Sequence, residues 1–142
     1  MGLALTQGIS FTTAYYWDYD HETRAFARRF FELHESMPTM TQAGVYSAAI
    51  HYLKAVAKVE TLESDAVMAE MKKSKVNDFF GRGGYIRTDG RMVHDMYLVE
   101  VKKPSESKEP WDIAKVRQVI PGEEEEAVAP LEKSSCPFLE MR

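Results

Sequence analysis

The sequence predicts a mixed α/β fold that forms part of a larger lobe. A β-branched and aromatic segment comes first, three amphipathic segments follow it, and strand-like segments return afterwards. These segments occupy residues 8–17, 20–36, 41–59, 64–73 and 85–120. The order is not a self-contained alternation of strands and helices, and the first strand has no sequence-adjacent partner. We therefore expect a partial lobe: a strand, three helices, and then a hairpin and further strands.

The first strand and its exit are predicted from composition. Residues 8–17, GISFTTAYYW, are rich in Phe, Thr, Tyr and Ile and contain no internal breaker, which is typical of a strand. Asp18 and Asp20 follow and are suited to cap the next helix, with Glu22 in its first turn.

The three helices are predicted from apolar residues at helical spacing. The first is expected to end before Pro38, because the residue before a proline disfavours helical geometry. Thr39 or Thr41 can cap the second helix, and the third begins near Ser64. The second helix carries one apolar stripe, formed by Val45, Ala48, Ala49, Tyr52, Leu53 and Val56.

The last third of the chain predicts strands and then a tail. Asp89-Gly90 between strand-like runs indicates a hairpin, with residues 96–102 as the returning strand and residues 113–120 as a last strand. The acidic run at residues 123–126 is typical of a solvated segment. We expect one folded part over residues 1–121 and a loosely ordered acidic tail over residues 122–142.

Composition excludes several classes of function. The formal net charge of −4 does not favour nucleic acid or an anionic membrane as partner. No apolar run approaches the roughly 20 residues that span a bilayer. The N-terminus has no basic region ahead of an apolar one, so it is not a signal peptide, and the chain as written is expected to remain cytoplasmic.

Catalytic and metal-binding patterns are absent from the sequence. It contains no dinucleotide or P-loop motif and no nucleophile elbow, and its four histidines are scattered without metal-ligand spacing. We expect no catalytic residues, no metal, no cofactor and no enzyme activity. The single cysteine, Cys136, is either an inert thiol in a terminal segment or a half-cystine with a partner elsewhere.

Two groups of residues are candidates for ligand contact. Tyr15, Tyr16 and Trp17, followed by Asp18, are either core residues or an amphipathic wall for a small organic ligand at a strand end. Gln42 and Tyr46, near the start of the second helix, pose the same choice, since a helix N-terminus with a nearby amide and phenol suits a carboxylate.

The order of several segments resembles a known family. The segments are GISFTTAYYWDYDHETRAFARRF, MPTMTQAGVYSAAIHYLKAV, VNDFF, GYIRTDGRMVHDMYLVEVKKP, PWDIAKVRQVIPG and CPFL. Together they resemble the C-terminal part of a type I periplasmic solute-binding protein of the branched-chain amino-acid (Leu/Ile/Val-binding) ABC transporter family.

The resemblance implies a two-lobe protein that closes as a hinge on its ligand. It implies that a small amino acid or an aromatic or other organic acid is captured between the lobes and passed to an ABC permease by the full-length, periplasmic parent. By position in the family pattern, the residues that face the cleft are Tyr16, Trp17, Asp18, Gln42 and Tyr46. The family is more than twice this length, and most of its signature ligand contacts lie in the part not matched here.

Part of a lobe exposes the helix faces and strand edges that the remainder would cover. We therefore expect a homo-oligomer, with the strand at residues 8–17 pairing across a dimer. The alternatives to a fragment of a binding protein are a free-standing protein-interaction module and a non-binding truncated remnant that self-associates.

Overall fold

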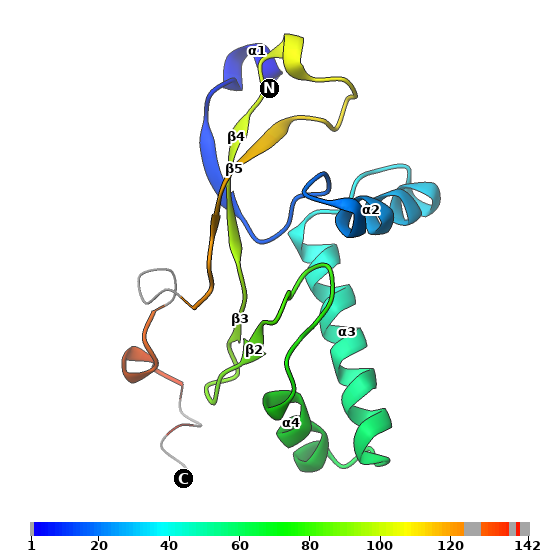
Figure 1. Cartoon of the computed structure of the whole chain (residues 1–142), viewed down its shortest axis with the longest axis vertical. Helices are drawn as coiled ribbons and strands as arrows, with labels where there is room; N and C mark the ends of the chain where they lie inside the picture. The colour runs from blue at the N-terminus through cyan, green and yellow to red at the C-terminus, as the bar shows by residue number, and fades with distance from the viewer. Residues whose placement is uncertain (1, 124–128, 137–138, 140–142) are drawn as a thin grey trace. The chain divides into compact units, whose positions relative to one another are not determined.

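The chain folds into two compact units. The computed structural model describes residues 2–123, 129–136 and 139. Unit 1 comprises residues 1–42 and 96–120, and unit 2 comprises residues 43–95 and 121–142 (Figure 1). Each unit is therefore assembled from segments that are distant in the sequence.

Unit 1 is built on a three-stranded antiparallel sheet. Its strands are β1 (Ser10–Thr13), β4 (Met96–Val101) and β5 (Ala114–Ile120), in the order β1-β4-β5, and Figure 1 shows β4 and β5 side by side. The short helix α1 (Leu3–Thr6) precedes β1. The predicted first strand is thus shorter than residues 8–17, and its partner β4 lies far along the chain, with Phe11 opposite Val99.

The core of unit 1 follows the two-residue period of β4. Tyr97, Val99 and Val101 are buried, whereas the alternate residues of this strand are only half-buried. Tyr97, Val99 and Ala114 form one apolar cluster. The partly buried residues that pack against this cluster are Tyr16, Tyr19, Val116 and Val119.

The helix α2 (His21–His34) begins at a complete capping box. The Asp20 carboxylate accepts hydrogen bonds from the backbone N–H groups of Glu22 and Thr23, and the Thr23 hydroxyl accepts one from the Asp20 N–H. Of the two predicted caps, Asp20 therefore performs the role. The helix ends at Glu35, whose φ of 52° is left-handed.

The helix α3 (Met40–Val59) begins where it was predicted, with the Thr39 hydroxyl accepting from the Thr41 N–H at 3.3 Å. The predicted stripe is largely exposed, with Val45 at 66% and Leu53 at 56%. The buried positions are instead Ala43, Ser47, His51 and Ala55.

Hydrogen bonds explain why polar side chains are buried beneath α3. The Ser47 hydroxyl donates to the Asp78 carboxylate at 2.6 Å, and His51 Nε2 lies 2.9 Å from the carbonyl oxygen of Met71. Buried polar groups with partners are tolerated, and small residues allow close packing. These two contacts therefore fix which side of α3 faces the rest of unit 2.

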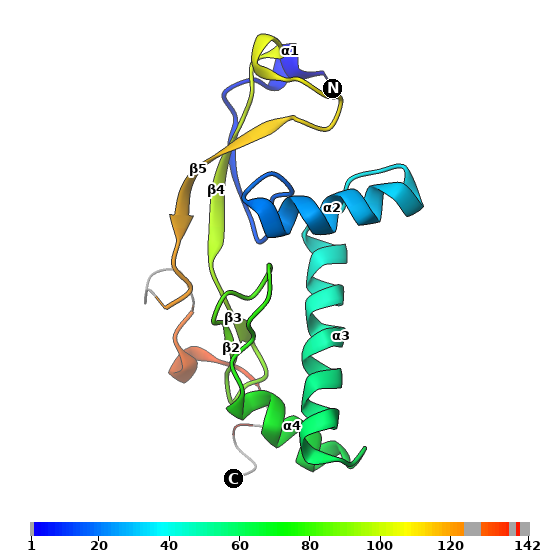
Figure 2. The same cartoon turned by 45° about the vertical axis from the view of Figure 1, so that its right-hand side comes forward.

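Unit 2 also contains the helix α4 (Ser64–Lys73) and a short hairpin. The two strands of this hairpin, β2 (Tyr85–Ile86) and β3 (Met92–Val93), lie side by side in Figure 2. Asp89-Gly90 forms the turn, as predicted, with Gly90 at a φ of 82°. The predicted strand at residues 96–102 is present as β4, but its predicted pairing was wrong, because β3 is the returning strand of this hairpin and β4 joins the sheet of unit 1.

Two short 3-10 helices complete the described structure, at Pro104–Glu106 and Leu131–Lys133. Of the predicted acidic run only Glu123 is described, and residues 124–126 lie outside the described residues. Cys136 is a half-buried free thiol. Within the described part of the chain, every helix is too short or too polar to cross a membrane.

Candidate ligand-binding site

A cavity of about 550 Å³ lies in unit 1, next to the aromatic residues that follow β1. Three segments contribute to it: residues 11–17, residues 37–41 and residues 110–114. Its lining is predominantly aromatic and aliphatic, with Thr hydroxyls as the main polar groups. The principal apolar side chains of the lining are Phe11, Tyr15, Tyr16, Trp17, Met37, Met40, Trp111 and Ile113.

Tyr16 connects this cavity to the sheet. Its hydroxyl donates to the backbone oxygen of Ala114 at 2.6 Å and accepts from the Ala114 N–H at 3.1 Å. Burial raises the pKa of Tyr16 to about 12, and the carboxylates of Asp112 and Asp18 act in the same direction. The hydroxyl is therefore hydrogen-bonded to the backbone of Ala114, the first residue of β5, while the ring lines the cavity.

Trp17 supplies the second aromatic wall. Its ring centroid lies 6.2 Å from that of Tyr16 at a tilt of 52°. Its Nε1 is buried and, within the described residues, makes no hydrogen bond of normal geometry, although its proximity to the Tyr16 hydroxyl lowers the pKa of that phenol. An indole N–H with spare donor capacity in a cavity wall suits an acceptor atom of a ligand.

Tyr15 has a different role from its two neighbours. It is buried, donates its hydroxyl to the backbone oxygen of Thr23 at 3.1 Å and packs edge-on against Phe26 at 6.1 Å. Burial raises its pKa, with Asp20 adding to the effect. Tyr15 is therefore a core residue that also borders the cavity, whereas Trp17 contributes to the cavity wall.

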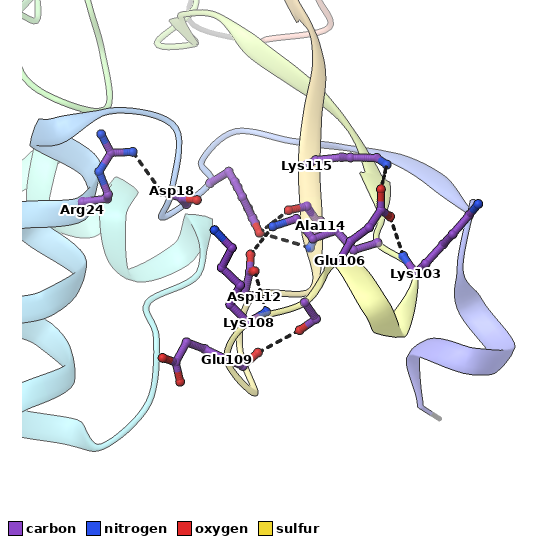
Figure 3. Close-up of polar contacts among 12 residues, drawn as sticks. Asp18, Arg24, Lys103, Glu106, Lys108, Glu109, Asp112, Ala114 and Lys115 are labelled. Atoms are coloured by element: carbon purple, nitrogen blue, oxygen red, sulfur yellow. Dashed lines mark hydrogen bonds and ion pairs between the residues drawn. The ribbon is translucent and has the colours of Figure 1, made fainter.

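Trp111 also lines the cavity and was not singled out from the sequence. It packs on Phe31 of α2 with ring centroids 4.7 Å apart. The adjacent Asp112 is buried and pairs with the Lys102 ammonium, and its carboxylate also accepts from the Lys108 N–H at 3.1 Å (Figure 3). Burial opposes ionisation, but these partners hold the pKa of Asp112 below its ordinary value. The sequence signal that could have identified Trp111 is a tryptophan directly after Pro110, in a loop between two predicted strands.

Three of the five predicted site residues do not line the cavity. Asp18 pairs with Arg24 at 2.9 Å, as Figure 3 shows. The Gln42 side-chain oxygen accepts from the Thr39 N–H and hydroxyl at 2.9 and 2.6 Å, so it serves the start of α3. Tyr46 belongs to unit 2, where its ring lies 5.7 Å from that of Phe79. Of the five predicted site residues, the cavity brings together Tyr16 and Trp17.

The described residues contain no candidate metal-binding site. Among them, no group of three or more His, Cys, Asp or Glu side chains is arranged to hold a metal ion. No charged residue of the described chain lines the cavity. The arrangement is suited to enclosing an apolar or aromatic group.

Comparison with known proteins identifies the family. A family described as "Periplasmic binding protein" matches residues 1–108. The chain belongs to this family. No curated protein matches the chain.

Solved structures agree with this assignment. A periplasmic binding protein from Burkholderia mallei is 50% identical, with a TM-score of 0.89 over 96% of this chain and 36% of that one. A branched chain amino acid ABC transporter periplasmic ligand-binding protein from Burkholderia xenovorans LB400 is 44% identical, with a TM-score of 0.90 and the same coverage. This periplasmic-binding-protein chain thus spans about a third of the length of these two relatives.

A more distant structure agrees in fold alone. The leucine-, isoleucine-, valine-, threonine-, and alanine-binding protein from Brucella ovis, in its closed conformation, is 15% identical, with a TM-score of 0.73 over 90% of this chain. The predicted resemblance to type I periplasmic binding proteins of the branched-chain amino-acid ABC family is confirmed, as is the predicted fold class of a partial lobe. The family consists of periplasmic binding proteins.

Proposed function

We propose that this chain forms part of the solute-binding component of a branched-chain amino-acid-type ABC importer, which captures a small amino acid or an aromatic or other organic acid between two lobes. The observation that carries the proposal is an aromatic cavity around Tyr16 and Trp17 in a chain of the periplasmic binding protein family. The similarity to a branched chain amino acid ABC transporter periplasmic ligand-binding protein from Burkholderia xenovorans LB400 supports the transporter class.

The lining of the cavity suggests which part of the ligand it takes. Aromatic and aliphatic walls without charged groups suit a branched-chain or aromatic side chain. An ammonium or carboxylate would be costly to bury there without a partner. In this proposal Tyr16 and Trp17 contact the apolar part of the ligand.

The proposal also includes location and partners. The full-length protein acts in the periplasm and delivers its ligand to an ABC permease. The isolated chain self-associates, because its sheet leaves β1 as an edge strand with Phe11 at 43% exposure.

Thermal unfolding with a ligand panel tests the binding proposal. The panel contains leucine, isoleucine, valine, phenylalanine and benzoate, each added to the 142-residue chain at fixed protein concentration. A ligand present at 100 times its Kd stabilises the native state by about 2.7 kcal/mol. We expect at least one panel member to raise Tm, and Trp17→Ala to abolish that rise.

The matched control is Tyr52→Ala, which removes an aromatic ring that is 42% exposed and outside the cavity. It should retain the ligand-dependent rise in Tm. An equal loss in both variants, or no response of the unaltered chain to any panel member, would contradict the assignment of ligand contact to this cavity.

A further inference from the structure

Another cavity lies wholly within unit 2, and its chemistry differs from that of the aromatic cavity in unit 1. Its volume is about 260 Å³, and its lining comes from the C-terminal part of α3 and from residues 74–78, which follow α4. Figure 2 shows α4 beside this end of α3. We call the cavity the lysine pocket, because Lys54, Lys58 and Lys75 line it.

Two of the three lysines are held in place by contacts within unit 2. The Lys58 ammonium donates to the buried carboxylate of Glu70 at 2.6 Å. That carboxylate also accepts from the Ser74 hydroxyl, and the two hydrogen bonds hold the pKa of Glu70 below its ordinary value. Lys75 Nζ lies 4.4 Å from the centroid of the Tyr85 ring. Both ammonium groups are therefore positioned before any ligand is bound.

The lysines of the pocket have little compensating negative charge. Lys54 lies one helical turn before Lys58 on α3, and like charges at this spacing repel each other. Within the described part of the chain Lys54 forms no ion pair, and Lys75 approaches Glu123 only to 3.9 Å, with both side chains mostly exposed. Because exposed pairs of this kind contribute little, an anion in the pocket relieves a repulsion that the chain itself leaves in place.

The acidic residue of the lining, Asp78, has hydrogen-bond donors of its own. Its Oδ1 accepts from the backbone N–H groups of Phe80 and Gly81 at 2.9 and 2.7 Å, and its Oδ2 accepts from the Ser47 hydroxyl at 2.6 Å. Both carboxylate oxygens are thus already hydrogen-bonded. Asn77, the preceding residue, adds a side-chain amide with two N–H donors to the lining.

A phosphate group matches this arrangement. Three ammonium groups attract a dianion about twice as strongly as a monoanion at the same distance. Lysine binds phosphate well because its charge is concentrated on one compact group. The volume suits a phosphate group with at most a small substituent. The whole chain has a formal net charge of −4, so the attraction for an anion is a property of the pocket and not of the chain as a whole.

We propose that the lysine pocket binds a phosphate group, presented either as free inorganic phosphate or as a small phosphate monoester. Lys54, Lys58 and Lys75 supply the charge, and Asn77 supplies neutral donors. This site is additional to the ligand cavity of unit 1, and the proposal does not rest on the solute-binding function.

Backbone-amide NMR of the 142-residue chain tests the proposal. Inorganic phosphate, glycerol 3-phosphate and acetate are titrated separately at fixed ionic strength and about pH 8, where histidines are neutral and lysines are charged. We expect saturable shift changes at Lys54, Lys58 and residues 74–77 with at least one phosphate compound, and weaker binding of acetate. The phosphate compound with the lower Kd identifies the form in which the group is bound.

Removal of one ammonium group tests its contribution. We expect Lys54→Gln to raise Kd about tenfold, the loss that one hydrogen bond to a charged group produces. Lys133→Gln is the matched control and should leave Kd unchanged, because Lys133 is an exposed lysine of unit 2 outside the pocket. Thermal unfolding of both variants checks that they are folded.

Three results would overturn the proposal. The first is no saturable response to either phosphate compound, or acetate binding as tightly as they do. The second is a Kd that Lys54→Gln leaves unchanged or alters no more than Lys133→Gln does, which would make the response a general charge effect. The third is binding to phosphatidylglycerol vesicles without binding of either soluble compound, which would assign the lysines to a membrane surface.

Discussion

At the scale of single residues, Tyr16 joins the candidate site to the sheet. Its ring lines the cavity, while its hydroxyl makes two hydrogen bonds to the backbone of Ala114 at the start of β5. A residue with both roles couples the shape of the cavity to the register of the strand. Substitutions of Tyr16 therefore need a stability measurement beside any binding measurement.

Replacing Tyr16 by Phe keeps the ring and removes the hydroxyl. We expect the free energy of unfolding to fall by about 1–3 kcal/mol, because two hydrogen bonds in a half-buried environment are lost together. Urea unfolding measures the change. Tyr52→Phe, at a site that is 42% exposed, is the control and should stay within about 0.5 kcal/mol of the unaltered chain. A loss as small as that of the control would show that the hydroxyl does not secure β5.

At the scale of elements, the helix starts differ in how they are capped. Asp20 satisfies two backbone N–H groups at the start of α2, whereas Glu63, at the equivalent position of α4, makes no side-chain cap. Thr23, in the first turn of α2, and Phe26, in the second, are buried in unit 1. The cap of α2 therefore supports packing as well as helix formation.

Asp20→Ala should reduce the free energy of unfolding by about 1 kcal/mol, within the range measured for lost N-caps. Glu63→Ala is the matched control and should change it by less than about 0.5 kcal/mol, because no cap hydrogen bond is removed. Chemical denaturation of the two variants in parallel provides the comparison. Equal effects would mean that the capping box of α2 contributes nothing beyond helix propensity.

At the scale of the whole molecule, apolar surface is exposed in both units. In unit 1 the edge strand β1 has three exposed residues out of four, including Phe11. An unpaired strand edge with an apolar side chain favours pairing with another chain.

We expect the isolated chain to self-associate at high micromolar concentration and Phe11→Lys to weaken that association by about tenfold, since a charged edge residue opposes strand pairing. Sedimentation velocity over a concentration series measures the dissociation constant. Leu33→Lys, at a site of α2 that is 80% exposed, is the control and should leave the association unchanged. A monomer at all concentrations would refute self-association.

The sequence was a good guide to helices and a poor guide to strand partners. Periodicity, Asp20 and Pro38 placed α2, and α3 and α4 lie within a residue of their predicted bounds. The Asp89-Gly90 turn was also correct. The strand at residues 96–102 was correct but its partner was wrong, because a tight turn dictates only the pairs next to it, whereas β4 pairs with a strand from the other end of the chain.

The candidate site was predictable in part. Aromatic residues at a strand end indicated Tyr16 and Trp17, and both line the cavity. Trp111 was not predicted, because it reaches the cavity only through the pairing of β4 with β5 and the ion pair of Lys102 with Asp112. The local sequence around Trp111 does not indicate these long-range contacts.

By itself the sequence determined the mixed fold class and the positions of α2, α3 and α4, because these depend on local pattern and composition. The order of its segments, through their resemblance to known proteins, indicated the family. Only the tertiary structure decided which side of α3 is buried. Apolar periodicity gives a helix two distinguishable sides, but the hydrogen bonds of Ser47 and His51 to Asp78 and Met71 select the polar one. These partners lie 31 and 20 residues away along the chain, so their contribution appears only when the chain has folded.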